Sequence, residues 1–404
     1  MNIRVIDSPC GTGKTEYAIK YMNENSENTN FIYITPFLSE IERVMSNVNF
    51  KISTPKEGSK SKDLLELVFK GKHIATTHSL FNRGNGELAR LLEDNGYELI
   101  LDEVLTVLDP IPFKKGDFTY LKRVEAFEIC EDNVVKLSEF GKDLLQKGTE
   151  FKSKLELIES GRVILVDDMM LVWEFPADLL KCFNKITIMT YLFKQQTMCN
   201  YLLANGAEFE YFYLENYNLI SGACSYDGRA YKNLVKIYDG KLNSIGQKAF
   251  SLSSSWFIDK NNFRSKKILM DNAFNYFYHN INKRIDRVLW TIPKQIFNDG
   301  LFVKSYKGAF LEMTARATNL YAERDTCAYL VNRFENPMLQ KYFQKHGLSV
   351  NDDVFALSEL IQWLFRSAIR KNKPINLYIP SKRMRELLQA WLDGSFDEKY
   401  NKKD

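Results

Sequence analysis

A short segment near the N-terminus has the residue types and spacing of a loop that binds phosphate groups. It fits the pattern G-x-x-x-x-G-K-[S/T], except for a serine in place of the first glycine, and it reads Ser8-Pro9-Cys10-Gly11-Thr12-Gly13-Lys14-Thr15. The two glycines let the backbone turn tightly, so that its N–H groups surround an anion. Lys14 would contact the β- and γ-phosphates, and the Thr15 hydroxyl would bind Mg²⁺. The segment from Gly11 to Thr15 therefore predicts a site for ATP and Mg²⁺.

Two consecutive acidic residues, Asp102 and Glu103, have the chemistry needed beside that loop. They follow the apolar residues 99–101, and ligands of open α/β sheets bind at the carboxyl ends of the strands. Asp102 would hold Mg²⁺ through water, and Glu103 would orient and activate the attacking water. Asp167 and Asp168 form a competing pair after a second apolar run. The spacing from the phosphate loop favours 102–103 and leaves 167–168 as turn residues.

A third group of catalytic candidates lies near the C-terminus, where Gln362, Arg366 and Arg370 are spaced four residues apart. On one helix the three side chains would share a face. Guanidinium groups suit phosphate, so Arg366 or Arg370 is expected to stabilise charge on the γ-phosphoryl group. The simpler alternative is an amphipathic helix with solvated arginines. The nearby Arg383 and Arg385 are expected to have no part in hydrolysis.

The elements that must position these residues alternate between strands and helices. Strands are expected at residues 3–6, 31–35, 73–77 and 99–101, and helices at 15–24 and 38–46. Strands return at 163–166 and 185–189, and a second α/β pattern has strands near 288–291, 327–331 and 376–379. Such alternation is typical of parallel sheets with crossover helices. It predicts an α/β fold with domains at residues 1–210 and 211–404 and a cleft between them.

The sequence between about 109 and 161 is charged and favours helices, which indicates a helical insertion in the first domain. The insertion is either a nucleic-acid clamp or partner surface or, on the simpler interpretation, a solvated structural element.

Composition narrows the class of protein further. The chain has 404 residues with 45% hydrophobic and 26% charged residues, which is typical of a globular protein of two or three domains. A net charge of +4 indicates that any basic path for nucleic acid must be local. The six scattered cysteines and four histidines do not form a metal-binding pattern. No signal segment or membrane-spanning run is visible, so we expect a cytoplasmic protein without a membrane partner.

These motifs, taken together, resemble those of superfamily two helicases, most closely the phage DEAD/DEAH-box-like group. That group looks related to the helicase part of herpesvirus origin-binding proteins. The phosphate loop is similar to motif I and residues 102–105 to motif II. Looser matches lie at residues 34–44, 75–80, 188–193, 288–294 and 314–325, and residues 362–370 resemble motif VI. There, Phe365 replaces a glycine and the second arginine is one residue late, while Thr190 alone keeps the hydroxyl character of motif III.

The resemblance implies two tandem RecA-like P-loop domains that close on ATP and move nucleic acid. It implies a helicase or translocase acting in phage DNA replication or recombination, in the host cytoplasm, on single-stranded or forked nucleic acid and with DNA preferred to RNA. Replication or recombination proteins are the implied partners. The family's motifs place the contacts to phosphate or sugar at Thr35, Thr77, His78, Thr318 and Asn319.

Three alternatives stay open. The protein could be a nucleic-acid-dependent ATPase that remodels or anneals strands without unwinding them. It could be a P-loop kinase of a small molecule, which explains the phosphate loop alone. It could also be a scaffold in which a nucleotide only orders the fold.

Overall fold

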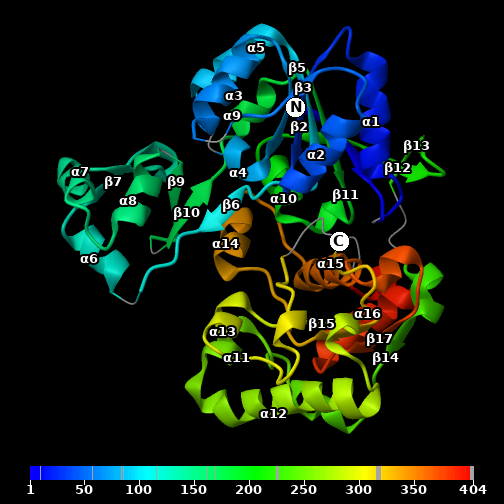
Figure 1. Ribbon diagram of the computed structural model, residues 1–404. Helices are drawn as coiled ribbons and strands as arrows, with labels where there is room; N and C mark the ends of the chain where they lie inside the picture. The colour runs from blue at the N-terminus through cyan, green and yellow to red at the C-terminus, as the bar shows by residue number, and fades with distance from the viewer. Residues whose placement is uncertain are drawn as a thin grey trace.

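The chain folds into an N-terminal α/β domain, an inserted subdomain and a C-terminal α/β domain (Figure 1). The structure is a computed structural model. It describes all residues except 10, 57, 83, 85, 115, 161, 169, 224–226, 315–319 and 401–404, and the side chains of 132 and 195. In the view of Figure 1 the N-terminal domain is at the top, the subdomain at the left and the C-terminal domain at the bottom. Within the described residues, no helix is long and apolar enough to cross a membrane.

The N-terminal domain is built on an eight-stranded sheet in the order β13-β12-β1-β11-β5-β2-β4-β3. All neighbours are parallel except the antiparallel pair β12 and β13. The strands are β1 (Asn2–Asp7), β2 (Asn30–Thr35), β3 (Ile52–Ser53), β4 (His73–Thr77), β5 (Tyr97–Asp102), β11 (Lys185–Thr190), β12 (Glu208–Glu215) and β13 (Asn218–Ser221). The strands predicted in this region are thus confirmed to within two residues, and the sheet is mainly parallel.

Helices cover both faces of this sheet because alternate side chains of each strand point to opposite faces. Ile32 and Ile34 belong to one apolar cluster, whereas Phe31 and Tyr33 of the same strand belong to the other. Figure 1 shows α1 and α2 on one side and α3 and α5 on the other. The helices are α1 (Lys14–Asn25), α2 (Leu38–Asn47), α3 (Lys60–Phe69), α4 (His78–Phe81), α5 (Gly86–Asn95), α9 (Ala177–Lys181) and α10 (Thr197–Ala204).

The insertion is a mixed α/β subdomain: the helices predicted within 109–161 are present, but short strands accompany them and the subdomain extends to residue 174. It runs from β6 to β10 and joins the three strands β6-β10-β9 into a small antiparallel sheet beside a β7–β8 hairpin. Its elements are β6 (Leu108–Pro110), α6 (Asp117–Arg123), β7 (Phe127–Ile129), β8 (Val135–Leu137), α7 (Glu139–Gln146), α8 (Lys152–Glu159), β9 (Val163–Val166) and β10 (Met170–Glu174). The short strands were missed because runs of three residues give no resolvable alternation.

The C-terminal domain has a four-stranded parallel sheet in the order β14-β17-β16-β15. Its strands are β14 (Val235–Ile237), β15 (Val288–Thr291), β16 (Thr326–Tyr329) and β17 (Ile375–Tyr378). Its helices are α11 (Ser254–Ile258), α12 (Phe263–Asn275), α13 (Lys294–Asn298), α14 (Pro337–Lys345), α15 (Asp352–Leu364), α16 (Lys382–Leu392) and α17 (Phe396–Tyr400). The three strands predicted here are confirmed.

The boundary between the two domains lies later than residue 210, which falls inside β12. Because β12 and β13 pair onto β1, the first sheet ends at Ser221. Helix α14 also crosses the division, since its buried Leu339, Tyr342 and Phe343 pack in the apolar core of the N-terminal domain. The Tyr342 hydroxyl donates to Glu174 of β10 at 2.8 Å. The inserted subdomain therefore contacts both domains.

Candidate nucleotide-binding site

The phosphate loop joins β1 to α1 at the carboxyl edge of the first sheet. Gly11 and Gly13 have φ angles of 88° and 90°, in the left-handed region that favours glycine. Gly13 is the N-cap residue of α1, so the first N–H groups of the helix point into the loop. The described residues of the segment thus have the geometry of an anion-binding turn.

Ser8 replaces the usual first glycine for a structural reason. Its φ is not positive, so the position does not need glycine. Its buried hydroxyl accepts a hydrogen bond from the Leu214 N–H of β12 at 2.7 Å, and its own N–H donates to the Thr190 carbonyl at 2.9 Å. The serine therefore fastens the start of the loop to β12 and β11.

The loop holds the Lys14 ammonium group at its centre. Lys14 Nζ donates to the carbonyls of Ser8 at 2.6 Å and Pro9 at 3.0 Å, and its residue is only 8% exposed. The Thr12 hydroxyl donates to the same Pro9 carbonyl at 2.9 Å. An ammonium group held by the loop carbonyls near the N-terminus of α1 places a positive charge where a polyphosphate can bind.

The predicted metal ligands lie side by side. Thr15 Oγ1 is 3.3 Å from Asp102 Oδ2, and the hydroxyl of Tyr33 donates to the same carboxylate oxygen at 2.6 Å. Hard oxygen donors of this kind fit Mg²⁺, which is held through few protein ligands and several waters. Tyr33 was not among the predicted site residues. It lies inside β2, where its ring reads as an ordinary core residue.

Burial strongly perturbs the Asp102 carboxyl. Burial raises its pKa to about 6; the Tyr33 hydrogen bond opposes this rise, the neighbouring Glu103 charge adds to it and Lys14 opposes it. In the metal-free protein the ionised carboxyl is therefore less stable than an exposed carboxylate, and a cation would relieve that cost.

This pKa gives a prediction for stability. Because the folded-state pKa lies above the unfolded-state value, the cost of ionised Asp102 is present above about pH 6 and disappears as the pH falls toward 4. Asp102→Asn should therefore stabilise the metal-free protein at pH 8 by roughly 3 kcal/mol, with no difference near pH 4. Thermal and urea unfolding in EDTA measure this. If Asp102→Asn were less stable than the native protein at pH 8, the hydrogen bond from Tyr33 and the charge of Lys14 would fully offset the cost of burying the carboxylate.

Glu103 faces the same cavity as Asp102 because the strand ends between them. Glu103 has a φ of 73°, which breaks the alternation of β5, and both carboxylates line the cavity. Glu103 Oε2 accepts a hydrogen bond from Thr190 Oγ1 at 2.9 Å. Gln196 donates to Thr190 Oγ1 at 3.1 Å and to the Tyr191 carbonyl at 2.7 Å. Thr190 and the unpredicted Gln196 thus fix the orientation of Glu103.

The two arginines of the C-terminal domain complete one cavity with the N-terminal residues. The cavity has a volume of about 330 Å³ and is lined by Gly11, Gly13, Lys14, Thr15, Glu16, Glu40, Arg43, Asp102, Glu103, Tyr217, Arg366 and Arg370. Arg366 is 1% exposed, and its Nε has no hydrogen-bond partner among the described residues. A buried guanidinium is unfavourable without compensation, so an anion in this cavity would supply what the protein does not.

The prediction that Gln362, Arg366 and Arg370 share one helix face was wrong. Helix α15 ends at Leu364, and Arg370 lies in the following 3₁₀ turn, Ala368–Lys371. Gln362 does not line the cavity, and its Nε2 is 3.5 Å from the Tyr191 carbonyl, to which Gln196 also donates. Gln362 therefore contacts the N-terminal domain and lies outside the cavity lining.

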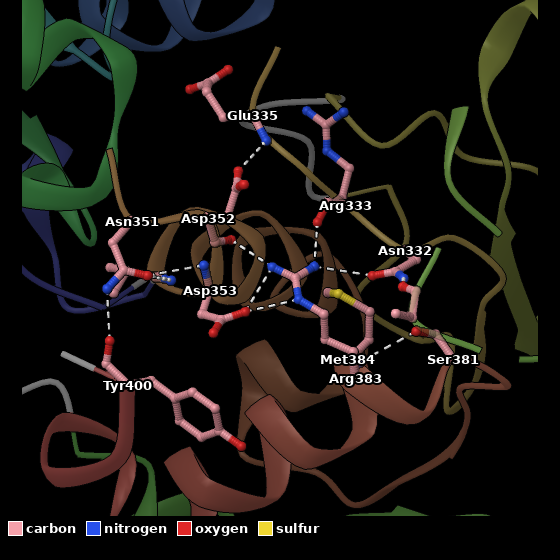
Figure 2. A network of polar contacts seen from close by, with 12 residues as sticks. Asn332, Arg333, Glu335, Asn351, Asp352, Asp353, Ser381, Arg383, Met384 and Tyr400 are labelled. Atoms are coloured by element: carbon pink, nitrogen blue, oxygen red, sulfur yellow. Dashed lines mark hydrogen bonds and ion pairs between the residues drawn. The ribbon is translucent and has the colours of Figure 1, made fainter. Parts of the chain in front are cut away.

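Arg383 and Arg385 are structural residues, which makes them poor neutral controls. Figure 2 shows the Arg383 guanidinium between Asn332, the Arg333 carbonyl and the start of α15. It donates to Asp353 Oδ1 at 2.8 Å and to the Asp352 carbonyl at 2.9 Å. Arg385 donates to the carbonyls of residues 379 and 380 at 2.7 and 2.8 Å. Substitution of either arginine would lower the stability of the fold, since each donates hydrogen bonds to backbone carbonyls of the C-terminal domain.

The competing acidic pair is confirmed as a turn. Asp167 and Asp168 have φ angles of 52° and 54° between β9 and β10, and neither lines the cavity. Asp167 forms ion pairs with Lys341 at 2.6 Å and Lys345 at 3.5 Å, both on α14. In the described residues, no cluster of three or more His, Cys, Asp and Glu side chains could hold a metal ion.

The residues predicted to contact nucleic acid are only partly described. Thr35 and Thr77 are register partners at the ends of β2 and β4, and His78 begins α4. The Thr35 side chain is fully buried, so it does not reach the surface, whereas Thr77 and His78 are half-buried. Thr318 and Asn319 lie outside the described residues.

The fold of the chain is similar to that of apo XPD. The match to a structure of apo XPD covers 96% of this chain and 95% of the XPD chain, with a TM-score of 0.53 and 14% identity. A structure of S. tokodaii Xpd4 covers 98% and 95%, with a TM-score of 0.46 and 10% identity. Fold and site together define an α/β protein with a phosphate loop and a fold similar to that of XPD.

One relative shows the family. The chain is 37% identical over 410 residues to the SPbeta prophage-derived uncharacterized protein YonV of Bacillus subtilis (strain 168), covering 97% of this chain and 99% of that one. Residues 229–392 match the family described as YonV C-terminal Rossmann-like domain. The chain belongs to the YonV family.

Proposed function

We propose that this protein is an ATP-dependent helicase or translocase of superfamily two, built from two RecA-like domains. One observation carries the proposal: the phosphate loop and acidic pair of one domain and two arginines of the other line a single cavity. A small-molecule kinase would need neither the second α/β domain nor arginines supplied across a domain boundary. The buried charge of Arg366, whose Nε has no hydrogen-bond partner among the described residues, also favours an anion over a neutral ligand.

Several residues of the cavity would take part in ATP hydrolysis. The loop N–H groups and Lys14 bind the β- and γ-phosphates, and Thr15 and Asp102 would hold Mg²⁺, which offsets phosphate charge when bound. Glu103, held by Thr190, orients the attacking water and accepts its proton. Arg366 and Arg370 stabilise the charge that develops on the γ-phosphoryl group.

A chain of hydrogen bonds connects the water-activating residue to the C-terminal domain. Glu103 contacts Thr190, Thr190 contacts Gln196, and Gln196 shares the Tyr191 carbonyl with Gln362 of α15. Hydrolysis at Glu103 would therefore change the contact between the two domains. Opening and closing of the cleft would shift the contacts to a nucleic-acid strand.

The setting we propose is phage DNA replication or recombination in the host cytoplasm. The motifs resemble those of the phage DEAD/DEAH-box-like group, which looks related to the helicase part of herpesvirus origin-binding proteins. The prophage origin of the Bacillus subtilis relative supports a phage setting. The substrate would be single-stranded or forked nucleic acid, DNA more than RNA, with replication or recombination proteins as partners. Backbone contacts would come from Thr77, His78, Thr318 and Asn319, and from Thr35 only after a rearrangement that exposes it.

The proposal predicts that polynucleotide stimulates ATP hydrolysis. Phosphate release should rise when single-stranded DNA is added, and binding should weaken steeply with salt because phosphate contacts dominate. Lys14→Ala should abolish both basal and stimulated hydrolysis because the charge at the loop centre is lost. The assay compares single- and double-stranded DNA and RNA, together with displacement of a labelled strand from a fork.

The outcomes separate the alternatives. Stimulation without strand displacement would indicate an ATPase that remodels or anneals. Phosphate transfer to a small acceptor, with indifference to every polynucleotide tested, would contradict the motor and indicate a kinase.

A further inference from the structure

An aromatic side chain at the edge of the nucleotide cavity has no role in the mechanism above. Tyr217 lies at the tip of the β12–β13 hairpin, where Glu215 pairs with Asn218 and only two residues form the loop. Among the described residues that line the cavity, Tyr217 is the only aromatic one. The others are glycines, a threonine and charged residues, which suit a triphosphate but offer no surface for a base.

The hairpin holds Tyr217 in an unfavourable backbone conformation. Asn216 and Tyr217 have φ angles of 48° and 65°, as a two-residue turn with both central residues left-handed requires. Asparagine tolerates this region, and glycine is the usual second residue, whereas a bulky side chain there is rare. Strain of this kind is found where a side chain is needed in one place.

The ring lies against the phosphate loop rather than in a core. The ring lies so close to Gly13 that a methyl group added there would be 2.6 Å from two ring carbons. Only glycine therefore fits at this position beside Tyr217. The residue is nevertheless 68% exposed. Exposed aromatic surface beside a phosphate-binding turn is positioned for the part of a nucleotide that extends out of the turn.

The remaining side chains of the cavity rim leave this role to Tyr217. Arg43 is ion-paired with Glu16 and, at 3.1 Å, with Glu40, so its charge is already compensated. No asparagine or glutamine side chain lines the described cavity. Glu16, Glu40 and Arg43 could read the hydrogen-bonding edge of a base, but they are paired with one another, so stacking is what the cavity offers.

We propose that Tyr217 is the stacking platform for the nucleotide base and that the site accepts purine nucleoside triphosphates with little discrimination between adenine and guanine. Every base has a π-face, so stacking binds bases without reading their edges. A purine covers more of the Tyr217 ring than a pyrimidine does, so purine nucleotides should bind more tightly than pyrimidine nucleotides. This inference rests on the proposed function and adds to it the substrate class.

The experiment compares a probe with a base and a probe without one. Calorimetry with the full chain and Mg²⁺ gives dissociation constants for ADP, GDP, CDP and inorganic tripolyphosphate. The wild-type protein should bind ADP and GDP within about threefold of each other and CDP more weakly. Tyr217→Ala should weaken ADP and GDP on the order of tenfold and leave tripolyphosphate unchanged, because only base stacking is lost. Tyr217→Phe should bind like the wild type.

Two further variants guard against a structural explanation. Tyr217→Gly produces an Asn-Gly turn, which this hairpin favours, so its melting temperature should stay or rise while ADP binding falls. Tyr120→Ala removes an exposed tyrosine of the inserted subdomain and should leave all four constants unchanged.

Several results would overturn the inference. Unchanged ADP binding in Tyr217→Ala would refute stacking while leaving the phosphate site intact. Tighter binding of ADP and tripolyphosphate alike would show that the ring obstructs the loop. A strong preference for ADP over GDP would contradict the predicted breadth. If the wild-type protein bound none of the probes, the proposed nucleotide site itself would fail.

Discussion

Glu103→Gln is expected to stop ATP turnover while leaving ATP binding intact. The glutamine keeps the size of the side chain and accepts the Thr190 hydrogen bond, which is 2.9 Å in the native protein, but it cannot accept a proton from water. General-base catalysis contributes roughly 10²–10⁴-fold, so the rate of phosphate release should fall by that range. Single-turnover hydrolysis and calorimetry with ATP measure the two properties separately.

Asp168→Asn is the matched control, since it changes an acidic residue of the β9–β10 turn that does not line the cavity. It should hydrolyse ATP at the native rate. Near-native turnover by Glu103→Gln combined with loss in Asp168→Asn would show that the acidic pair had been wrongly assigned.

Arg366→Ala should reduce turnover by about 10³–10⁵-fold with little change in ATP affinity. An arginine that reaches the γ-phosphoryl group from the opposite domain has an effect of this size in related phosphate enzymes. Arg366 is the buried member of the pair, and its Nε has no partner in the described protein, so its interaction is available for the reacting phosphate. Arg370→Ala should also cost orders of magnitude, although this half-buried residue lies on a separate turn.

The substitution Arg366→Lys should not restore the rate, because an ammonium group lacks the planar fork that binds two phosphate oxygens. Arg264→Ala, at an exposed position of α12, provides the control for loss of one positive charge. Normal hydrolysis by Arg366→Ala would leave Arg370 as the single catalytic arginine. Normal hydrolysis by both variants would contradict the two-domain mechanism.

The cavity also shows how the chain accommodates its departure from the motif that residues 362–370 resemble. A stripe on one helix would have required Gln362 and both arginines to face the phosphates together. Instead the helix ends after Leu364, which sends Arg366 and Arg370 into the cavity and leaves Gln362 against the Tyr191 carbonyl. The late second arginine thus reaches the cavity through a 3₁₀ turn.

The sequence alone determined the phosphate loop, the acidic pair and most of the strands that present them. Gly11, Gly13 and Lys14 are informative because their chemistry is local: a tight left-handed turn followed by a helix needs these residue types at this spacing. The strands β2 and β5 are also local signals, since each is a short and largely apolar run that is buried on both faces of a parallel sheet.

Contacts between distant segments were decided by the tertiary structure alone. From the sequence, Tyr33 is an ordinary core residue of β2, and only the folded protein brings it to Asp102. Likewise Tyr217 is an ordinary turn residue in the sequence, and only the fold places its ring against Gly13. The same holds for the first domain, whose sheet continues past residue 210 because β12 pairs with β1 across some two hundred residues of sequence. Pairing and packing of this kind depend on which surfaces meet in space, and no periodicity within one segment records that.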